Sequence, residues 1–439
     1  MFSRIVLDNF KCFSHFELDL RQNKEAKKVK NLAFIYGENS IGKSTIVDAF
    51  LLLSKLASSI EQKAFYEKFF SELNTEDKFP FNRYFLSPDI SYDAPAYLKY
   101  LKKINSTEPM SVQYEGYINL YKFIYRVEFN SEKIINEKCL IDGSLIFGTG
   151  RYGFAKLPLS YFGSQELIDK INERSRMYNG KYSILSCIHS VLNEANKKFV
   201  LNNVNKLVID FVNEMGDLTV YRAVNTNSAM LSKNSKLLPV LTFGIFNDEL
   251  KTILELTKTA LTMYFSSVSP NIRGVDYDLE MRNDNQRYYH LIFLEKNGDS
   301  IIRVPYYFAS TGVKKLLDLF PIFFEIAYSN HVVVIDEVDS GINDILLESI
   351  FSSFCKEVKG QLIVTTHNTL LLKKINKKYV YLLDKDENDE VYSYSLDSFG
   401  RKIQPKTNVV KQYLEGLYGG VPQTGNFSMK YIINEVKNG

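Results

Sequence analysis

Three short runs of apolar residues stand out along the chain, at residues 32–36, 332–335 and 362–364. None of them alternates with polar residues. An unbroken apolar run of this length is typical of a strand that is buried on both faces of a sheet. The three runs are followed by a glycine-rich turn, by two acids and by a Thr-Thr-His segment, respectively. The pattern predicts an α/β protein whose buried strands end in ion-binding or reactive groups.

Elsewhere the spacing of apolar residues changes along the chain. Alternation with period two predicts strands at residues 2–7, 15–20, 110–115, 120–129, 140–147, 274–281, 288–294 and 300–304. Residues 164–269 instead follow helical spacing, without the long heptads of a coiled-coil rod. We therefore expect a compact helical lobe between two sets of strands.

Composition narrows the class of protein. A length of 439 residues exceeds one ordinary domain, so a second lobe or a large insertion is expected. The hydrophobic content of 45% is that of a globular protein, and a net charge of +3 gives no bulk signature of nucleic-acid binding. The four cysteines lack metal-ligand spacing, which favours a reducing compartment. Because no apolar run reaches the roughly 20 residues needed to cross a bilayer, we expect a cytoplasmic protein with no membrane partner.

The first apolar run leads into a loop that fits the phosphate-binding pattern G-x-x-x-x-G-K-[ST]. Its residues are Gly37, Glu38, Asn39, Ser40, Ile41, Gly42, Lys43, Ser44 and Thr45. A mostly apolar helix is expected directly after it, which gives the strand, loop and helix that a P-loop requires. The loop N–H groups would bind phosphates, Lys43 would bridge the β- and γ-phosphates of ATP, and Ser44 would offer its hydroxyl to Mg²⁺.

The second run ends in Asp336 and Glu337, which is the Walker B pattern. We expect Asp336 to join Ser44 in the Mg²⁺ shell and Glu337 to polarise the attacking water. The third run leads to His367, and a histidine one strand after Walker B can reach the γ-phosphate. The predicted catalytic set is Lys43, Glu337 and His367.

A segment shortly before Walker B has two interpretations. Ser310 and Gly312 stand at the start of an apolar helix, where they form either a simple N-cap or a second anion site. In the second case they correspond to an ABC-type signature that closes on the nucleotide of another subunit. We adopt the second interpretation, so both residues are predicted to bind nucleotide in trans.

Taken together, these motifs resemble those of ABC ATPases, and residues 5–13 are similar to the first strand of the SMC/RecF/OLD branch. Three further stretches resemble the AbiL-like AAA-family ATPases of bacterial anti-phage systems. That group includes the ATPase of PARIS-type defence and partners of RloB-like proteins. The stretches are residues 310–321, residues 334–341 and the tail 413–422, which is close to Y-L-x-G-x-Y-G-x-x-P.

This resemblance implies an α/β fold, an ABC-type P-loop ATPase head with mixed β-sheet, an antiparallel β subdomain and an inserted helical lobe. Residues 1–155 and 271–439 would form the two halves of the head, with the lobe at 156–270. ATP and Mg²⁺ are the implied cofactors, and a homodimer or higher homo-oligomer would form through composite ATP sites. The implied role is the sensor of an abortive-infection system that controls a separately encoded Toprim or RloB-like effector.

Two other functions stay open on the sequence. A RecF/SMC-like DNA-repair ATPase would bind duplex DNA, and a non-hydrolysing scaffold would use ATP only as structural glue. Two departures bear on the site: residues 311–313 replace the more usual acidic-Gly-Thr, and residues 339–342 lack the L-H-P that often follows Walker B. Gln113 and Gln165 are both candidates for the Q-loop glutamine.

Overall fold

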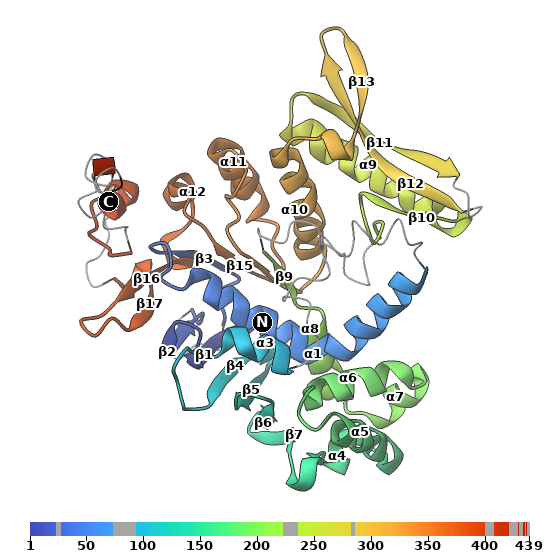
Figure 1. Ribbon diagram of the computed structural model, residues 1–439, viewed down its shortest axis with the longest axis vertical. Helices are drawn as coiled ribbons and strands as arrows, with labels where there is room; N and C mark the ends of the chain where they lie inside the picture. The colour runs from blue at the N-terminus through green and yellow to red at the C-terminus, as the bar shows by residue number, and fades with distance from the viewer. Residues whose placement is uncertain are drawn as a thin grey trace.

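Figure 1 shows the computed structural model of the protein. It describes residues 1–22, 28–72, 94–222, 236–281, 286–399 and 408–420, together with Met429, Ile433, Asn434 and Val436. Positions 421 and 422 of the tail motif lie outside these ranges. The described strands form three sheets, and the helices lie between and around them.

The three apolar runs lie side by side in the middle of a six-stranded sheet. Its order is β17 (Val391–Ser395), β16 (Val380–Lys385), β3 (Leu32–Tyr36), β15 (Gln361–Thr365), β14 (Val332–Ile335) and β9 (Thr219–Tyr221). All neighbours pair in parallel except β16 and β17. Every residue of β3, β14 and β15 is buried, so the prediction of two-sided burial is confirmed.

Alternate residues of this sheet face two separate hydrophobic clusters. Ala33 and Ile35 of β3 belong to the cluster that contains α1, whereas Phe34 and Tyr36 belong to the one that contains α10, α11 and α12. Helices therefore cover both faces of the sheet (Figure 1). These elements are α1 (Lys43–Glu72), α10 (Thr311–Tyr328), α11 (Asp344–Phe354), α12 (Thr369–Lys374) and, near the C-terminus, α13 (Val409–Leu414).

A seven-stranded antiparallel sheet packs on the far side of α1. Its order is β2 (Phe13–Asp19), β1 (Phe2–Phe10), β4 (Met110–Ile118), β5 (Tyr121–Phe129), β6 (Ile134–Ile141), β7 (Ser144–Thr149) and β8 (Ala155–Lys156). The single strand predicted at 140–147 is wrong, because the chain reverses there. Asp142 and Gly143 have φ values of 45° and 80°, the positive pair that a two-residue hairpin turn requires.

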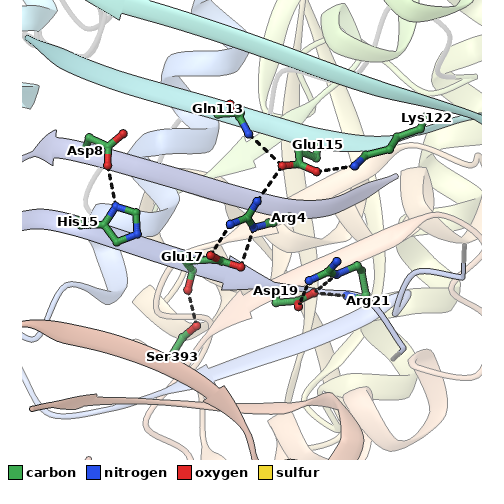
Figure 2. Close-up of polar contacts among 10 residues, drawn as sticks. All are labelled: Arg4, Asp8, His15, Glu17, Asp19, Arg21, Gln113, Glu115, Lys122 and Ser393. Atoms are coloured by element: carbon green, nitrogen blue, oxygen red, sulfur yellow. Dashed lines mark hydrogen bonds and ion pairs between the residues drawn. The ribbon is translucent and has the colours of Figure 1, made fainter. Parts of the chain in front are cut away.

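The outer face of this sheet carries a network of charged side chains (Figure 2). The Arg4 guanidinium donates to Glu17 at 2.6 and 2.5 Å and to Glu115 at 3.0 Å. Lys122 and Gln113 also contact Glu115, each at 2.9 Å. Because Glu17 and Glu115 lie on the strands either side of β1, the network supports the register of three strands.

The segment expected to be a helical lobe, residues 156–270, contributes to three parts of the fold. Its first helices form the lobe seen at the bottom of Figure 1: α4 (Leu159–Phe162), α5 (Gln165–Tyr178), α6 (Ile184–Glu194), α7 (Lys197–Asn203) and α8 (Lys206–Gly216). β9 then joins the central sheet, and α9 (Lys251–Val268) packs on a third sheet. That sheet consists of β10 (Phe243–Phe246), β12 (Arg287–Asn297), β11 (Ile272–Met281) and β13 (Ser300–Pro305).

The remaining elements are short. They are α3 (Ala94–Leu101) and the 3-10 turns η2 (Arg151–Gly153), η3 (Asp248–Leu250), η4 (Tyr306–Phe308), η5 (Lys377–Tyr379) and η6 (Leu396–Ser398). Across the described ranges, no helix is both long enough and apolar enough to cross a membrane.

One buried carboxylate joins the seven-stranded sheet to the helical lobe. Glu137 on β6 accepts N–H hydrogen bonds from Ile184 at 2.6 Å and Leu185 at 3.0 Å, the first residues of α6. It also accepts the Tyr125 hydroxyl at 2.8 Å. Glu137 thus shares the capping of α6 with the N-cap residue Ser183. Burial outweighs these three hydrogen bonds and raises the pKa of Glu137 to about 7.

This raised pKa predicts a pH dependence of stability. The ordinary carboxyl pKa is 4.5, whereas folded Glu137 holds its proton to about 7. The free energy of unfolding should therefore fall by about 3 kcal/mol as the pH rises through this window, and level off above it. Urea denaturation across the window measures the effect. Glu137→Gln should lose this part of the pH dependence, and the exposed control Glu132→Gln should keep it. Parallel pH profiles for wild type and Glu137→Gln would contradict the assignment.

Candidate nucleotide-binding site

The loop between β3 and α1 has the geometry of an anion-binding nest. Ser40 and Gly42 have φ values of 65° and 117°, which turn consecutive backbone N–H groups toward a common centre. A Cβ on Gly42 would lie 2.5 Å from the ring of Phe13, so a side chain does not fit there. Because α1 begins at Lys43, the loop also receives the free N–H groups of a helix N-terminus. The predicted loop residues, 37–45, occupy this turn and the first residues of α1.

Lys43 is folded back across the loop that precedes it. Its ammonium donates to the carbonyl oxygens of Gly37 at 2.9 Å and Glu38 at 2.8 Å, and the residue is only 6% exposed. Burial lowers the pKa of Lys43 to about 8, although the carboxylates of Glu337 and Asp336 oppose that shift. The lysine is thus a positive centre beside the acids of Walker B.

Asp336 connects the end of β14 to the P-loop helix and to β15. Its Oδ1 accepts hydrogen bonds from Thr365 Oγ1 at 2.6 Å and from Ser44 Oγ at 3.3 Å. Its own N–H donates at 2.8 Å to the carbonyl of Tyr221, the last residue of β9. Side chains far apart in the sequence meet here because parallel strands present their C-terminal ends at one edge of the sheet. The structure therefore brings Asp336 and Ser44 together.

Glu337 follows in a strained backbone conformation. Its φ of 45° lies in the left-handed region, which residues with a side chain rarely adopt and which often marks functional sites. Its N–H donates to Thr365 Oγ1 at 2.8 Å, which holds the turn. Among the charges that act on Lys43, that of Glu337 has the largest effect on the lysine pKa. The charge of this carboxylate thus acts on the P-loop lysine.

Asp339 and His367 lie at the same edge. Asp339 Oδ2 accepts the His367 backbone N–H at 3.0 Å, whereas Oδ1 is buried with no hydrogen-bond partner among the described residues. Partial burial, followed by the charge of Lys43, lowers the pKa of the His367 imidazole. The ring is therefore neutral near pH 7 and can donate one hydrogen bond while accepting another.

Ser310 and Gly312 occupy the first turn of α10, away from the hydrogen bonds just described. Ser310 is the N-cap, and its Oγ accepts the Val313 N–H at 3.3 Å. Gly312 packs so closely on the loop after Walker B that a Cβ would lie 3.2 Å from the Gly341 carbonyl oxygen. Ser310 is exposed, and within the described ranges no hydrogen bond joins its side chain to the P-loop of its own chain.

The C-terminal segment packs against the beginning of the P-loop. The Tyr413 hydroxyl donates to the Gly420 carbonyl at 3.2 Å, and the Tyr413 ring meets Tyr36 edge to face at a centroid distance of 6.1 Å. A Cβ on Gly420 would lie 2.9 Å from the Leu383 carbonyl oxygen and 3.5 Å from Gly37 Cα. The glycine in the tail motif therefore permits close support of the first P-loop residue.

Sequence patterns do not single out all the polar residues near this site. Thr365 contacts both Walker B acids, and the Thr-Thr-His segment that begins with the last residue of β15 is the signal that could have indicated it. Asp48, one turn after Ser44, is 2% exposed and forms ion pairs with Arg222 at 3.0 Å and with Lys11. An acid inside the apolar stretch that opens α1 is itself a signal, because a buried charge requires a partner.

Neither candidate for the Q-loop glutamine is placed with these residues. Gln113 belongs to the network on the outer face of the seven-stranded sheet (Figure 2). Gln165 is the first residue of α5 in the helical lobe, where it donates to Asp169 at 2.9 Å. Both side chains therefore have structural partners elsewhere.

The donor set fits a nucleoside triphosphate that carries Mg²⁺. The nest and Lys43 suit phosphate oxygens, and the Ser44 hydroxyl and the Asp336 carboxylate are the hard oxygen ligands that Mg²⁺ prefers. In the part of the chain that the structure describes, no group of three or more His, Cys, Asp or Glu side chains could hold a metal ion. A Mg²⁺ ion here would share its ligands with the phosphates, as it commonly does in nucleotide sites.

Two family models match the chain, one over each part of this site. The model described as "AAA domain, putative AbiEii toxin, Type IV TA system" matches residues 188–373, and one described as "AAA domain" matches residues 4–77. The second range contains the P-loop, and the first contains Ser310, Asp336 and His367. A search of curated proteins finds no match.

Solved structures of SMC head domains are similar to this chain at a low level. The SMC head bound to the C-winged helix domain of ScpA is 14% identical, covers 90% of this chain and 98% of its own, and has a TM-score of 0.46. The head from Thermotoga maritima is also 14% identical over 90% and 98%, with a TM-score of 0.39. The head with a coiled coil and joint from Pyrococcus yayanosii is 12% identical over 95% and 99%, with a TM-score of 0.46. At these scores the likeness supports no conclusion by itself.

The fold and the site nevertheless define the class of protein. A P-loop strand and a Walker B strand flank a third strand that ends in Thr-Thr-His, and an antiparallel sheet and a helical lobe are attached to this core. This is the architecture of an ABC-type P-loop ATPase head, as the sequence predicts. Matches to AAA-domain families over both parts of the site agree with that class.

Thr365 offers a direct test of the junction between Walker A and Walker B. Thr365→Val keeps the side-chain shape but removes the hydroxyl that donates to Asp336 and accepts from the Glu337 N–H. We expect the affinity for Mg²⁺-ATP, measured by titration calorimetry, to fall about 10- to 100-fold. Thr366→Val is the matched control, because its hydroxyl accepts only the Asn368 N–H in the described structure. Equal affinities of the two variants would show that the Thr365 hydroxyl does not support the site.

Proposed function

We propose that this chain is an ATP-binding and ATP-hydrolysing head that dimerises on ATP and regulates a separate effector in an anti-phage system. The observation that carries the enzymatic part is the junction at Asp336, where the Ser44 and Thr365 hydroxyls meet one carboxylate. A carboxylate next to the P-loop supports a role for Asp336 in binding Mg²⁺. Phosphoryl transfer to water requires mainly positioning and charge at such a point.

Each site residue has a role in this proposal. The loop N–H groups and Lys43 bind the β- and γ-phosphates, and the lysine exchanges its carbonyl contacts for phosphate oxygens. Ser44 and Asp336 hold Mg²⁺, which when bound offsets the charge of the phosphates. Glu337 orients a water molecule and accepts its proton, and the neutral His367 ring donates a hydrogen bond to the γ-phosphate.

The composite site is supported by the exposed start of α10. Ser310 and Gly312 lie at a helix N-terminus, which favours binding of phosphate oxygens. Because no hydrogen bond joins the Ser310 side chain to the P-loop within the described part of the chain, a second copy of the chain would supply the nucleotide that it binds. ATP would then lie between two copies and drive formation of a homodimer or a higher homo-oligomer.

The cellular role rests on resemblance rather than on geometry. The description of the model that matches residues 188–373 includes the words "putative AbiEii toxin, Type IV TA system". The tail motif shared with defence ATPases supports the P-loop through Gly420. We therefore assign the chain the role of sensor, with the toxic chemistry in a separately encoded Toprim or RloB-like effector. Co-expression with such an effector from the neighbouring genes, with and without phage, tests this role.

Substitutions at Lys43 and Glu337 should separate binding from hydrolysis. Lys43→Ala removes charge-assisted hydrogen bonds to phosphate, so ATP affinity should fall about 10- to 150-fold. Glu337→Gln should retain binding, lower kcat about 100- to 10,000-fold and accumulate an ATP-bound dimer in sedimentation velocity. Glu348→Gln on α11, which removes a carboxylate that pairs with Lys374, is the control for loss of a carboxylate. Hydrolysis by Glu337→Gln at the wild-type rate would refute its assignment as the base.

A DNA-repair function predicts a different dependence on salt. If duplex DNA were the regulator, it would stimulate ATP turnover, and the stimulation would fall steeply between about 50 and 200 mM salt because counterions are released on binding. The defence role requires no such stimulation. We expect turnover to be unchanged by duplex DNA at both salt concentrations. Salt-sensitive stimulation would favour the repair function over the sensor function.

A further inference from the structure

The helix that carries the signature residues also carries a buried lysine. Lys315 is 5% exposed, and its ammonium has no hydrogen-bond acceptor among the described residues. Nζ lies 4.6 Å from the centroid of the Tyr221 ring. A buried ammonium without an acceptor is unfavourable, and a cation–π contact compensates only part of that cost. Burial of the Lys315 ammonium therefore lowers the free energy of unfolding.

Backbone and ring contacts place Lys315 next to the end of the Walker B strand, β14. Tyr221 pairs with Ile335 in the central sheet, and its carbonyl accepts the Asp336 N–H at 2.8 Å. Gly312, three residues before Lys315 on the same face of α10, packs against Gly341. The Lys315 ammonium thus lies between α10 and the ends of β9 and β14.

Two carboxylates near this ammonium have unsatisfied oxygens. Asp318 Oδ2 and Asp339 Oδ1 are buried and have no hydrogen-bond partner among the described residues. Burial lowers the pKa of Lys315, and the charges that oppose this shift are led by Asp318 and then Asp339. Burial also raises the pKa of Asp318 to about 7. The charges of these two incompletely paired carboxylates therefore act on an ammonium that has no acceptor among the described residues.

An ion pair of Lys315 with Asp318 and one with Asp339 would connect different parts of the structure. Asp318 is on α10 itself, three residues after Lys315, so an ion pair between them links no separate elements. Asp339 lies in the loop after Walker B, and its other oxygen already accepts the His367 N–H. Pairing of Lys315 with Asp339 would connect the signature helix to that loop and to the end of β15.

We propose that Lys315 is a positioning residue that pairs with Asp339 Oδ1 when ATP closes two copies of the chain, an inference that rests on the proposed function. The nucleotide of the partner presses on the first turn of α10, and α10 shifts against the 339–341 loop on which Gly312 rests. The new ion pair fixes Asp339 and, through its second oxygen, His367. In each copy, binding of the partner's nucleotide to the start of α10 thus fixes Asp339 and His367 of the same copy.

A double-mutant cycle with Lys315→Met and Asp339→Asn tests this coupling. Each single change should lower kcat about 10- to 100-fold with KM for ATP within about threefold, because neither side chain is assigned a contact with the nucleotide and the pair forms only after ATP has bound. The double variant should be no slower than the slower single variant. ATP should also protect the amides of residues 339–341 from hydrogen exchange in wild type, and Lys315→Met should abolish that protection. Lys315→Arg should restore it in part.

Lys30→Met is a matched control for the loss of a buried lysine. Lys30 is 4% exposed, and its Nζ lies 4.9 Å from the centroid of the Tyr381 ring, at the opposite end of β3 from the P-loop. Lys30→Met should lower the free energy of unfolding without changing the ATP-dependent protection of the 339–341 amides from hydrogen exchange.

The outcomes distinguish the two levels of the proposal. Failure of wild type to bind or hydrolyse ATP refutes the proposed function. If wild type responds to ATP but the effects of Lys315→Met and Asp339→Asn multiply, or protection persists in Lys315→Met, the coupling role is refuted.

Discussion

The site depends on how one buried carboxylate is satisfied. Asp336 is 5% exposed, and a charge at that depth must be paired or hydrogen-bonded. Its partners come from either side: the Ser44 hydroxyl at the start of α1 and the Thr365 hydroxyl at the end of β15. The strand order explains this geometry, because β15 lies between the P-loop strand β3 and the Walker B strand β14. Thr365 therefore occupies the position from which one hydroxyl can orient Asp336 and accept the next N–H along the chain.

The long segment between the two Walker motifs is tied to the same edge. It returns to the central sheet through β9, whose Tyr221 carbonyl accepts the Asp336 N–H. The following residue, Arg222, pairs with Asp48 on α1. Closer to the N-terminus, Glu137 fastens the antiparallel sheet to α6. Tyr221 and Arg222 thus connect the inserted segment to the Walker B edge and to α1 by specific polar contacts.

Local patterns in the sequence predict much of the core but little of its pairing. The apolar runs and the P-loop residues are recognisable because strand burial and the phosphate-binding turn are set over a few neighbouring residues. β9 is only three residues long, too short for a periodic signal, although it completes the sheet beside Walker B. Gln361 opens an apolar strand, yet its side chain is fully buried and exchanges hydrogen bonds with the Phe2 N–H at 2.7 Å and carbonyl at 2.8 Å. Such a role depends on a partner hundreds of residues away, and Lys315 likewise packs on Tyr221 from a separate element.

The charges around Asp336 also affect whether free ATP or its Mg²⁺ complex fits the site. Asp336, Glu337 and Asp339 act on both Lys43 and Lys315, and Glu38 also acts on Lys43, so acids outnumber lysines where the phosphates would bind. His367 adds no positive charge near pH 7, because its pKa is lowered. A triphosphate that arrived without a cation would meet this excess of negative charge at short range and low dielectric. Mg²⁺ beside Asp336 would offset this excess of negative charge, so the same acids that disfavour free ATP would favour its metal complex.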